Sequence, residues 1–449
     1  HIAAGNEQIA RLGLTNVRLF EASFAALEPL SSEFEQPFDL VACNGIYSWL
    51  EDQPRQGLIK FLQRHLRPGG LFYVETTTLP GMAAVPPLWH LIQTLVPAAG
   101  RSSRQRAEEG LDWLERLSRR GMAFISSNPR AAAAARHYLK RADRDRDATL
   151  DHFIHNAMAS GFKPRYSTDV MSELASAGLR FAGRSCLPLN DIETAVPPSQ
   201  VPTLRDEADP GRRQLLMDFI RNEQNRRDVY IKDLSPDPEG SWQFLCNKLA
   251  LLGRSEPEKI ERAVVVEGGT HKIPLRGPLV DHLLSSFESQ PQTLAQALSA
   301  PAAPIDTSPD LLRRTCTRLI ASGQFFLCLP HRTVESTSLP AHPKFIFPHA
   351  ALVATRAEED REAVHLTSSL TGGAAIRLAP LEVLLLQEAC RSGFAGALES
   401  VQCLLATLPP GTLGSVSNPS PSDCEEVMLH LRGRKGQNLV RLGLLGSYD

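Results

Sequence analysis

The stretch FDLVACNGIYSWLEDQP, residues 38–54, decides the fold of the first part of the chain. Its first seven residues, 38–44, form a nearly continuous apolar run, which is typical of a strand buried on both faces of a parallel sheet. The stretch ends as a helix begins, with Asp52 placed to cap a helix over 54–66 and Pro54 in the first turn. Between strand and helix lie a polar residue, a glycine and two aromatic residues, so this strand end is a candidate ligand site.

Outward from this stretch, helices and strands alternate. Residues 2–12 have the apolar spacing of a helix, and Gly13 is placed to stop it. Strands are predicted at 16–23, which is rich in β-favouring residues, and at 71–77, after a turn at RPGG, residues 67–70. Such alternation predicts an α/β fold with a partial Rossmann-like sheet and crossover helices.

The next region is predicted to be mainly helical. Apolar residues recur at helical spacing from about 85 to 190, and again over 212–234. A proline-rich, polar stretch at 194–211 is predicted to be a linker or long loop.

The second half contains a weak internal repeat. The segments 270–287 and 372–389 each show a strand, a Pro-Leu pair and a helix, and each unit closes with a helix, a glycine and a strand. This pattern predicts two winged-helix-like α+β units in tandem, although Pro-Leu before a helix is common by itself. The predicted domains are 1–85, the partial sheet domain; 86–235, the helical domain; 236–335, the first winged-helix-like unit; and 336–449, the second.

Composition restricts the partners and the location. The 48 basic and 50 acidic residues nearly cancel, so no nucleic-acid partner is expected. No apolar run approaches the ~20 residues that span a bilayer, and no membrane association is expected. Eight cysteines without C-x-x-C spacing favour a reducing cytoplasm. The triplet Asp151, His152 and His155 lacks an evident fourth ligand, so no metal is predicted.

The strand end after residue 43 carries the residues suited to a ligand. Asn44 offers both a donor and an acceptor, and Gly45 lets the backbone come close to a bound molecule. Tyr47 and Trp49 offer flat apolar surfaces that suit a purine, a methionyl chain or a lysine stem. The alternative is that both aromatic side chains only pack the loop onto the sheet.

Several blocks together resemble the class I S-adenosylmethionine-dependent methyltransferases that carry a methyltransferase regulatory domain, which include bacterial protein-lysine methyltransferases. The blocks are NVRLFEASF, residues 16–24; FDLVACNGIYSWLEDQP, residues 38–54; LRPGGLFYVETTTLPG, residues 66–81; and two regulatory-domain segments, 155–183 and 217–231. The resemblance implies S-adenosylmethionine as cofactor and a protein substrate, with transfer to a side chain such as lysine. It implies cofactor binding by Ala22, Ser23, Asn44 and Gly45, and a catalytic substrate side formed by Tyr47 and Trp49.

Two departures from the family pattern open an alternative. Asn44 stands where the family usually has His, Thr76 and Thr77 replace Tyr-Asn, Met82 replaces Trp, and Asn156 replaces an acidic residue. In addition, no glycine-rich turn after a first strand is found, so the chain is expected to begin inside the methyltransferase domain. The alternative function is an inactive methyltransferase-like scaffold that acts as a regulatory or protein-binding module. The oligomeric state is left open.

Overall fold

The computed structural model describes most of the chain, in two compact units. The described residues are 2–27, 33–34, 36–143, 145–254, 261–265, 272–288, 291–304, 308–329, 339–345, 364–367, 375–407 and 419–447. One unit, here called the sheet unit, comprises Ala22–Pro236 with Val265–Lys272. The other, the C-terminal unit, comprises Asp237–Val264 and Ile273–Asp449, with His1–Glu21.

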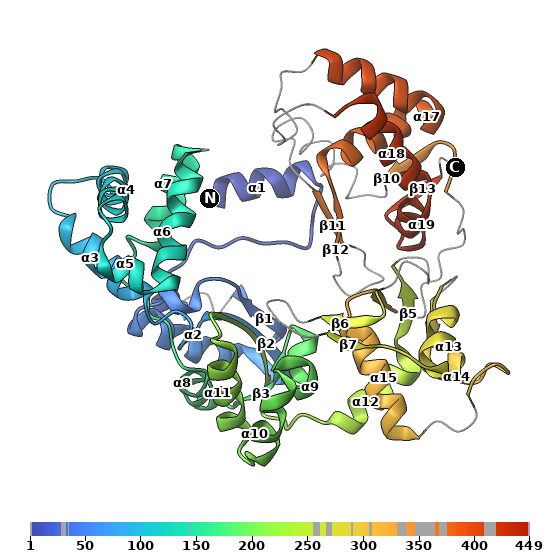
Figure 1. Ribbon diagram of the computed structural model, residues 1–449, viewed down its shortest axis with the longest axis horizontal. Coiled ribbons are helices and arrows are strands. Elements are labelled where there is room, and N and C mark those ends of the chain that lie inside the picture. The colour runs from blue at the N-terminus through green and yellow to red at the C-terminus, as the bar shows by residue number, and fades with distance from the viewer. Residues whose placement is uncertain are drawn as a thin grey trace. The chain divides into compact units, whose positions relative to one another are not determined.

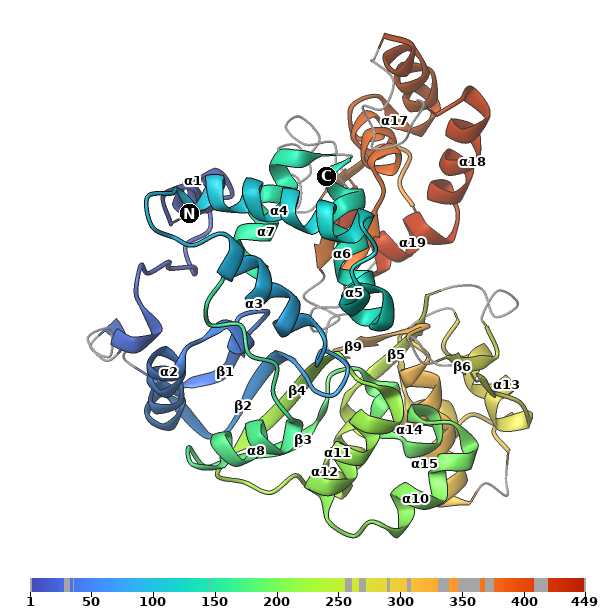
Figure 2. The same ribbon diagram turned by 60° about the vertical axis from the view of Figure 1, so that its left-hand side comes forward.

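A four-stranded mixed sheet organises the sheet unit, with the order β1-β2-β4-β3 (Figures 1 and 2). The strands are β1 (Phe38–Cys43), β2 (Leu66–Thr77), β3 (Leu179–Arg184) and β4 (Asn225–Lys232). β1 and β2 are parallel, and β4 runs antiparallel to both of its neighbours. The predicted α/β fold with a parallel pair of strands is therefore confirmed, and the sheet draws two strands from each side of the predicted boundary near residue 85.

Two predictions about the first strands are wrong. Residues 16–23, all of them described, form no strand; they run extended into a short helical turn, η1 (Phe24–Ala26), and Val17 and Leu19 are exposed. β1 was expected to be buried on both faces, but Leu40 is 58% exposed. The reason is its position: β1 is the edge of the described sheet and pairs only with β2, so an apolar run does not guarantee burial.

The elements around these strands begin and end differently from expectation. Helix α2 (Asp52–His65) has Glu51 as its N-cap residue, and Asp52 instead pairs with Arg55. The RPGG segment lies within β2 as a bulge: between two successive pairings, β1 advances by two residues while β2 advances by five. Gly69 has a φ of 74°, which suits glycine at this bulge.

The predicted helix over 212–234 is correct only for its first half. α11 (Pro210–Arg221) ends at Asn222, which adopts the left-handed conformation with a φ of 50°. β4 follows, and its side chains alternate between exposed and buried positions, the period of a strand. Tertiary pairing with β2 and β3 has overridden the helical pattern.

A helical layer follows β2 in the chain (Figure 1). It contains α3 (Val85–Leu95), α4 (Ser103–Arg119), α5 (Ala123–Ser127), α6 (Pro129–Ala142) and α7 (Arg146–Asn156). Their apolar faces share one core, and the predicted helical region is confirmed here and at α8 (Ser167–Ala175). Its end is wrong, because residues 179–184 form β3 and pair with β4. The predicted loop at 194–211 contains part of α9 (Ile192–Ala195), the turn η5 (Pro198–Gln200) and α10 (Val201–Asp206), so it is more ordered than expected.

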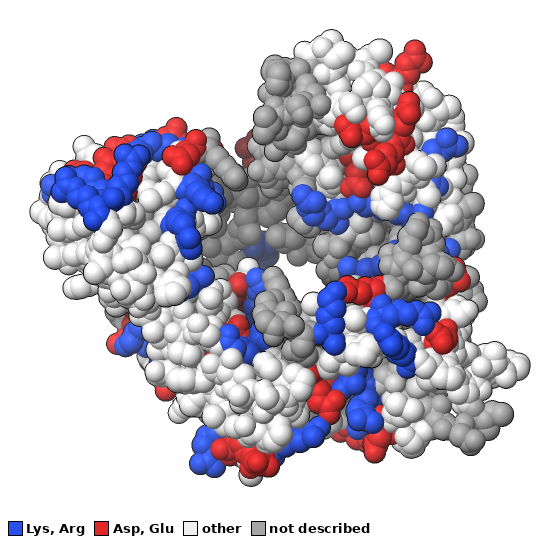
Figure 3. Space-filling model, in the orientation of Figure 1, with Lys and Arg blue, Asp and Glu red and all other residues white. Residues whose placement is uncertain are grey.

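The surface of this helical layer carries charges of both signs. Figure 3 shows Lys and Arg beside Asp and Glu over this part of the molecule. Arg104 pairs with Glu108 and Asp147, and Arg146 pairs with Asp112. The arginine-rich segments 101–106 and 140–147 thus pair with acidic residues of the layer itself, as is usual on a solvated helix surface.

The C-terminal unit contains both halves of the predicted repeat. Its elements are α1 (Ile2–Arg11), α12 (Pro238–Lys248), β5 (Ala250–Gly253), β6 (Ala263–Val265), β7 (Lys272–Pro274), α13 (Pro278–Ser286), β8 (Gln292–Thr293), α14 (Leu294–Leu298), α15 (Pro309–Ala321), β9 (Phe325–Cys328), β10 (Pro343–Phe345), β11 (Val364–Thr367), β12 (Ala375–Leu378), α17 (Pro380–Thr407), α18 (Pro421–Arg432), α19 (Arg434–Arg441) and β13 (Leu445–Ser447). The strand and helix on either side of each Pro-Leu pair are present, as are both closing helices and strands. The winged-helix form of the two units stays a prediction.

The two halves of the repeat share a core. Strands β5 and β9 of the first half contribute buried side chains to the same cluster as α17, α18 and α19. Basic side chains of residues 430–441 also join the halves, because Arg434 and Arg441 both donate to the carbonyl of Glu288. Within the described part of the chain, no helix combines the length and apolar character needed to span a membrane.

Candidate active site

The loop after β1 begins with an open backbone turn. Gly45 has a φ of 69°, a conformation that strains any residue with a Cβ, and no atom lies within 4 Å of the place where a Cβ would stand. The Asn44 side chain is exposed, and its Oδ1 lies 3.5 Å from the Tyr73 hydroxyl, which donates to it. The end of β1 therefore presents an amide and an uncrowded glycine to the surroundings.

Tyr47 begins the next helical turn, η3 (Tyr47–Trp49), and is completely buried. Its hydroxyl donates to Glu173 Oε2 at 2.8 Å, and Glu173 also pairs with Arg55 at 2.7 Å and with Arg165 at 3.3 Å. Burial raises the pKa of Tyr47 well above its usual range, and the negative charge of Glu173 raises it further. The phenol is thus a hydrogen-bond donor within a buried ion-pair cluster, and its predicted catalytic role stays a prediction.

Ser48 and Trp49 fasten the loop to two other segments. The backbone N–H of Thr77, the last residue of β2, donates to Ser48 Oγ at 2.8 Å. Lys163 N donates to the carbonyl of Ser48 at 2.8 Å, and the ring of Trp49 packs on that of Phe162 with centroids 5.0 Å apart. Gly161 is required beside them, because a Cβ there would stand 2.3 Å from the Trp49 carbonyl oxygen.

A cavity of about 500 Å³ lies where the carboxyl ends of β1 and β2 meet the helical layer. Trp49 lies on the loop after β1, Thr77 ends β2 and Asn225 begins β4. The cavity walls are largely aromatic and aliphatic: Trp49, Val85, Trp89, Ala133, Ala134, Tyr138 and Phe162. Four positions that the sequence analysis singled out line this one cavity: Trp49, Thr77, Met82 and Asn156.

The basic side chains of the cavity were not anticipated as site residues. Arg130 and His137 come from one face of α6, with Ala133 and Ala134 between them, a helical i, i+3, i+4, i+7 spacing that could have revealed them. His152 comes from α7. Burial lowers the pKa of His152, and the cationic Arg141 lowers it further. No Asp or Glu is among the residues that line the cavity.

None of the four predicted cofactor residues, Ala22, Ser23, Asn44 and Gly45, lines this cavity, and neither does Tyr47. The triplet Asp151, His152 and His155, weighed above as possible metal ligands, is not brought together there either. Of the triplet, only His152 lines it, and no cluster of three metal-binding side chains occurs among the residues described. Ala22 and Ser23 are exposed, and Ser23 Oγ accepts from Ala25 N at 3.3 Å to cap η1. No hydrogen bond joins either of these two described residues to Asn44 or Gly45.

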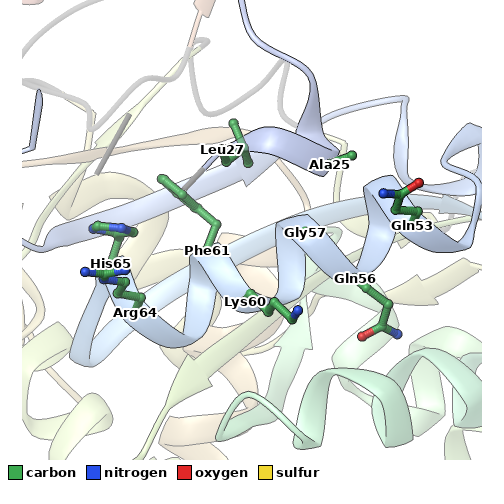
Figure 4. A pocket seen from close by; sticks show the side chains of 9 residues that line it. All are labelled: Ala25, Leu27, Gln53, Gln56, Gly57, Lys60, Phe61, Arg64 and His65. Carbon is green, nitrogen blue, oxygen red and sulfur yellow. The ribbon is translucent and has the colours of Figure 1, made fainter. Parts of the chain in front are cut away.

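A second, smaller cavity of about 220 Å³ lies between η1 and α2 (Figure 4). Its lining includes Gln53, Gln56, Lys60 and Phe61, on successive turns of α2, and none of the predicted site residues. It is therefore separate from the cavity around Trp49.

A buried charge network holds α11 against β3 and β4. Asp218, completely buried, pairs with Arg184 at 2.5 Å and with Arg226 at 2.6 Å. Glu223 pairs with Arg184 and with Arg221. Burial raises the pKa of Glu223, but the hydrogen bonds and charges of the two arginines outweigh burial and hold that pKa below its usual value. Arg221 and Arg226, which lie in the regulatory-domain segment 217–231, thus both belong to this charge network.

Comparison with known proteins shows what this segment and the fold are similar to. Residues 149–232 match the family model described as a predicted methyltransferase regulatory domain. An uncharacterized protein of Synechocystis sp., sll1526, is 27% identical over 304 residues, which are 66% of this chain and 56% of that protein. An uncharacterized protein of Rickettsia prowazekii, RP028, is 31% identical over 80 residues, 18% of this chain and 30% of that protein. The aligned part of the chain thus spans little more than half of the Synechocystis protein.

The fold matches a solved structure over nearly the whole chain. PKMT2 from Rickettsia typhi in complex with AdoHcy superposes with a TM-score of 0.63 at 16% identity, covering 99% of this chain and 87% of that one. The same protein in a second structure gives a TM-score of 0.62 over the same shares. The chain therefore shares the fold of PKMT2, and its residues 149–232 match the family model described as a predicted methyltransferase regulatory domain.

Proposed function

We propose that the intact protein transfers a methyl group from S-adenosylmethionine to a protein side chain such as lysine. The observation that carries the proposal is the cavity at the carboxyl ends of β1 and β2, because ligands of open α/β sheets bind at this edge. Three positions from blocks that resemble methyltransferases line it together, Trp49, Thr77 and Asn156, and Met82, directly after the third block, lines it as well. The complex of PKMT2 with AdoHcy supports the choice of cofactor.

Asn44 and Gly45 are the residues that would hold the methionine part of the cofactor. The exposed amide of Asn44 offers a donor and an acceptor, and the uncrowded Gly45 allows a ligand to approach the backbone. Ala22 and Ser23 are proposed to border the cofactor as well. S-adenosylmethionine supplies the chemistry, an electrophilic methyl group on a sulfonium sulfur.

The chain's own residues would position and deprotonate the acceptor. A lysine must lose its proton before its nitrogen can attack, and two properties of the cavity favour the neutral amine. Its walls are largely apolar, so they disfavour a charge, and Arg130 adds a like charge without a lining carboxylate to compensate. Trp49 and Phe162 would hold the lysine stem, in line with the methyl group.

The experiment measures transfer of labelled methyl groups from S-adenosylmethionine into a bacterial protein pool by the full-length protein. We expect labelled protein, with Trp49→Ala reducing turnover while cofactor binding persists, and Gly45→Val abolishing cofactor binding. Gly211→Ala, on the first turn of α11, is the matched control that leaves both unchanged. A folded, cofactor-bound protein that labels no protein contradicts the proposal.

The second candidate function is a methyltransferase-like scaffold without activity. For both candidate functions we propose a cytoplasmic location. The departures at Asn44, Thr76, Thr77, Met82 and Asn156 favour it, because three of these positions line the cavity. Under this reading the protein binds a protein partner, and Gly45→Val leaves that binding unchanged.

A further inference from the structure

The residues that line the cavity around Trp49 carry polar groups that lack a strong hydrogen-bond partner among the described residues. Trp49 Nε1, which can only donate, is buried and has no hydrogen-bond partner in the described structure. Among the described residues, the Arg130 side chain makes one hydrogen bond, from Nε to the sulfur of Met82 at 3.2 Å. A thioether is a weak acceptor. His152 Nδ1 is also buried without a partner in this part of the chain.

Arg130, which is half-buried, differs in this respect from the buried arginines of the sheet unit. Arg55, Arg184 and Arg226 each pair with at least one carboxylate at 2.8 Å or less. Arg130 forms no ion pair with any described residue, and burial alone lowers its pKa. A half-buried guanidinium without an anion is costly, so a missing partner is expected at this position.

No side chain that lines the cavity carries a negative charge. The cavity contributes one guanidinium and two imidazoles and no carboxylate. The permanent charge among the lining residues is therefore cationic, whereas Thr77, Asn156 and Asn225 can both donate and accept, so a ligand that neutralises the lining must be an anion. The fork of the guanidinium fits a carboxylate with two parallel hydrogen bonds, whereas an ammonium group would find no counter-charge here.

We propose that this cavity is a carboxylate-binding subsite, with Arg130 as the anchor of a carboxylate carried by the methyl acceptor. Calling the ligand an acceptor rests on the proposed function; the binding site itself does not. The carboxylate comes from an acidic side chain beside the acceptor residue of a protein, or from a small organic acid. The aromatic walls formed by Trp49 and Phe162 select an acid that carries an apolar group.

The test measures binding rather than methyl transfer, so its failure is distinguishable from failure of the proposed function. The full chain is titrated by calorimetry with 3-phenylpropionate and with its neutral amide, 3-phenylpropionamide. A second pair of probes is two capped pentapeptides with a central lysine, flanked by glutamate or by glutamine. Quenching of tryptophan fluorescence reports occupancy of the cavity, since Trp49 and Trp89 line it.

We expect the carboxylate of either pair to bind about ten- to a hundredfold more tightly than its neutral partner. Arg130→Gln should abolish this preference, and Arg130→Lys should retain part of it. Arg136→Gln makes the same change on an exposed position of the same helix and should leave the preference intact. Preference within the peptide pair identifies a protein source, and preference only for the free acid identifies a small molecule.

Two results overturn the proposal. One is equal binding, or no binding, of the carboxylate and its neutral partner in both pairs. The other is a preference that survives in a folded Arg130→Gln variant, with folding checked by circular dichroism.

Discussion

Replacing Gly161 by alanine should displace the Trp49 loop, because the two backbones touch. The added methyl group would stand 2.3 Å from the Trp49 carbonyl oxygen and 3.2 Å from Glu51 Cγ. Side-chain carbons essentially never come within 3.0 Å of such an atom, so the gap of 2.3 Å must widen by at least about 0.7 Å. The Trp49 carbonyl oxygen belongs to the backbone, so it cannot turn aside as a flexible side chain would.

The magnitude follows from the contacts that this movement breaks. Overpacking of a close contact costs about 1–3 kcal/mol. A shift of this size also stretches the 2.8 Å hydrogen bond from Lys163 N to the Ser48 carbonyl beyond its useful range, at a net loss of about 0.5–1.5 kcal/mol. We therefore expect Gly161→Ala to lower the free energy of unfolding by about 1.5–4.5 kcal/mol.

The assay is equilibrium unfolding in urea, followed by tryptophan fluorescence and by circular dichroism. The matched control is Gly211→Ala, whose nearest neighbour would be the flexible Asp209 side chain at 3.3 Å and whose helical position favours alanine. We expect the control to unfold within about 0.5 kcal/mol of the wild type or slightly later. Gly161→Ala behaving like this control, with an unchanged emission spectrum, would refute the close packing of the two segments.

Three further outcomes follow from burial and charge. Tyr47→Phe removes a buried hydrogen bond to the Glu173 carboxylate and should destabilise the protein by about 1–3 kcal/mol in urea unfolding, without changing the affinity of probes for the cavity. Glu223 has a depressed pKa in the folded state, so its stabilisation is complete above its usual pKa near 4.5 and is lost as pH falls through the depressed value. Glu223→Gln should therefore flatten the fall in stability between pH 5 and pH 3, and an unchanged slope would contradict this. Leu40→Ala should cost less than about 1 kcal/mol because the side chain is more than half exposed, whereas Leu62→Ala, at a buried position, should cost about 2–5 kcal/mol; equal costs would contradict the edge position of β1.

The sequence predicted the elements whose patterns are local. The helices over residues 2–11 and 52–65 and the strand 71–77 follow from apolar spacing and terminal glycine or proline, and the structure confirms them. The strand β4 could not be predicted in this way, because it places Arg226 and Asp228 in the interior. Charged residues are normally assigned to the surface, and here the ion pairs of Arg226 with Asp218 and with Asp228 offset the cost of burial.

The candidate site was likewise predicted only where a local pattern signals it. Trp49 was found because an aromatic residue after a strand and a glycine is itself a signal, and it lines the cavity. Arg130 and His137 were missed because an alanine-rich helix with Arg and His is the usual composition of a solvated surface. Their place in the cavity depends on how α6 packs against α3, α4 and α7, which no local pattern encodes.

The central position of β4 has a consequence for how the chain is made. Glu75 on β2 lies beside Arg227 on β4, 152 residues further on, and the whole helical layer is synthesised between them. At about 5–20 residues per second, β2 waits roughly 8–30 s on the ribosome before its second neighbour exists. During that interval one edge of an apolar strand is open to other chains, and contacts so distant in sequence form slowly. Yield of folded protein should therefore depend on chaperones and on translation speed more than the stability of the finished sheet would suggest.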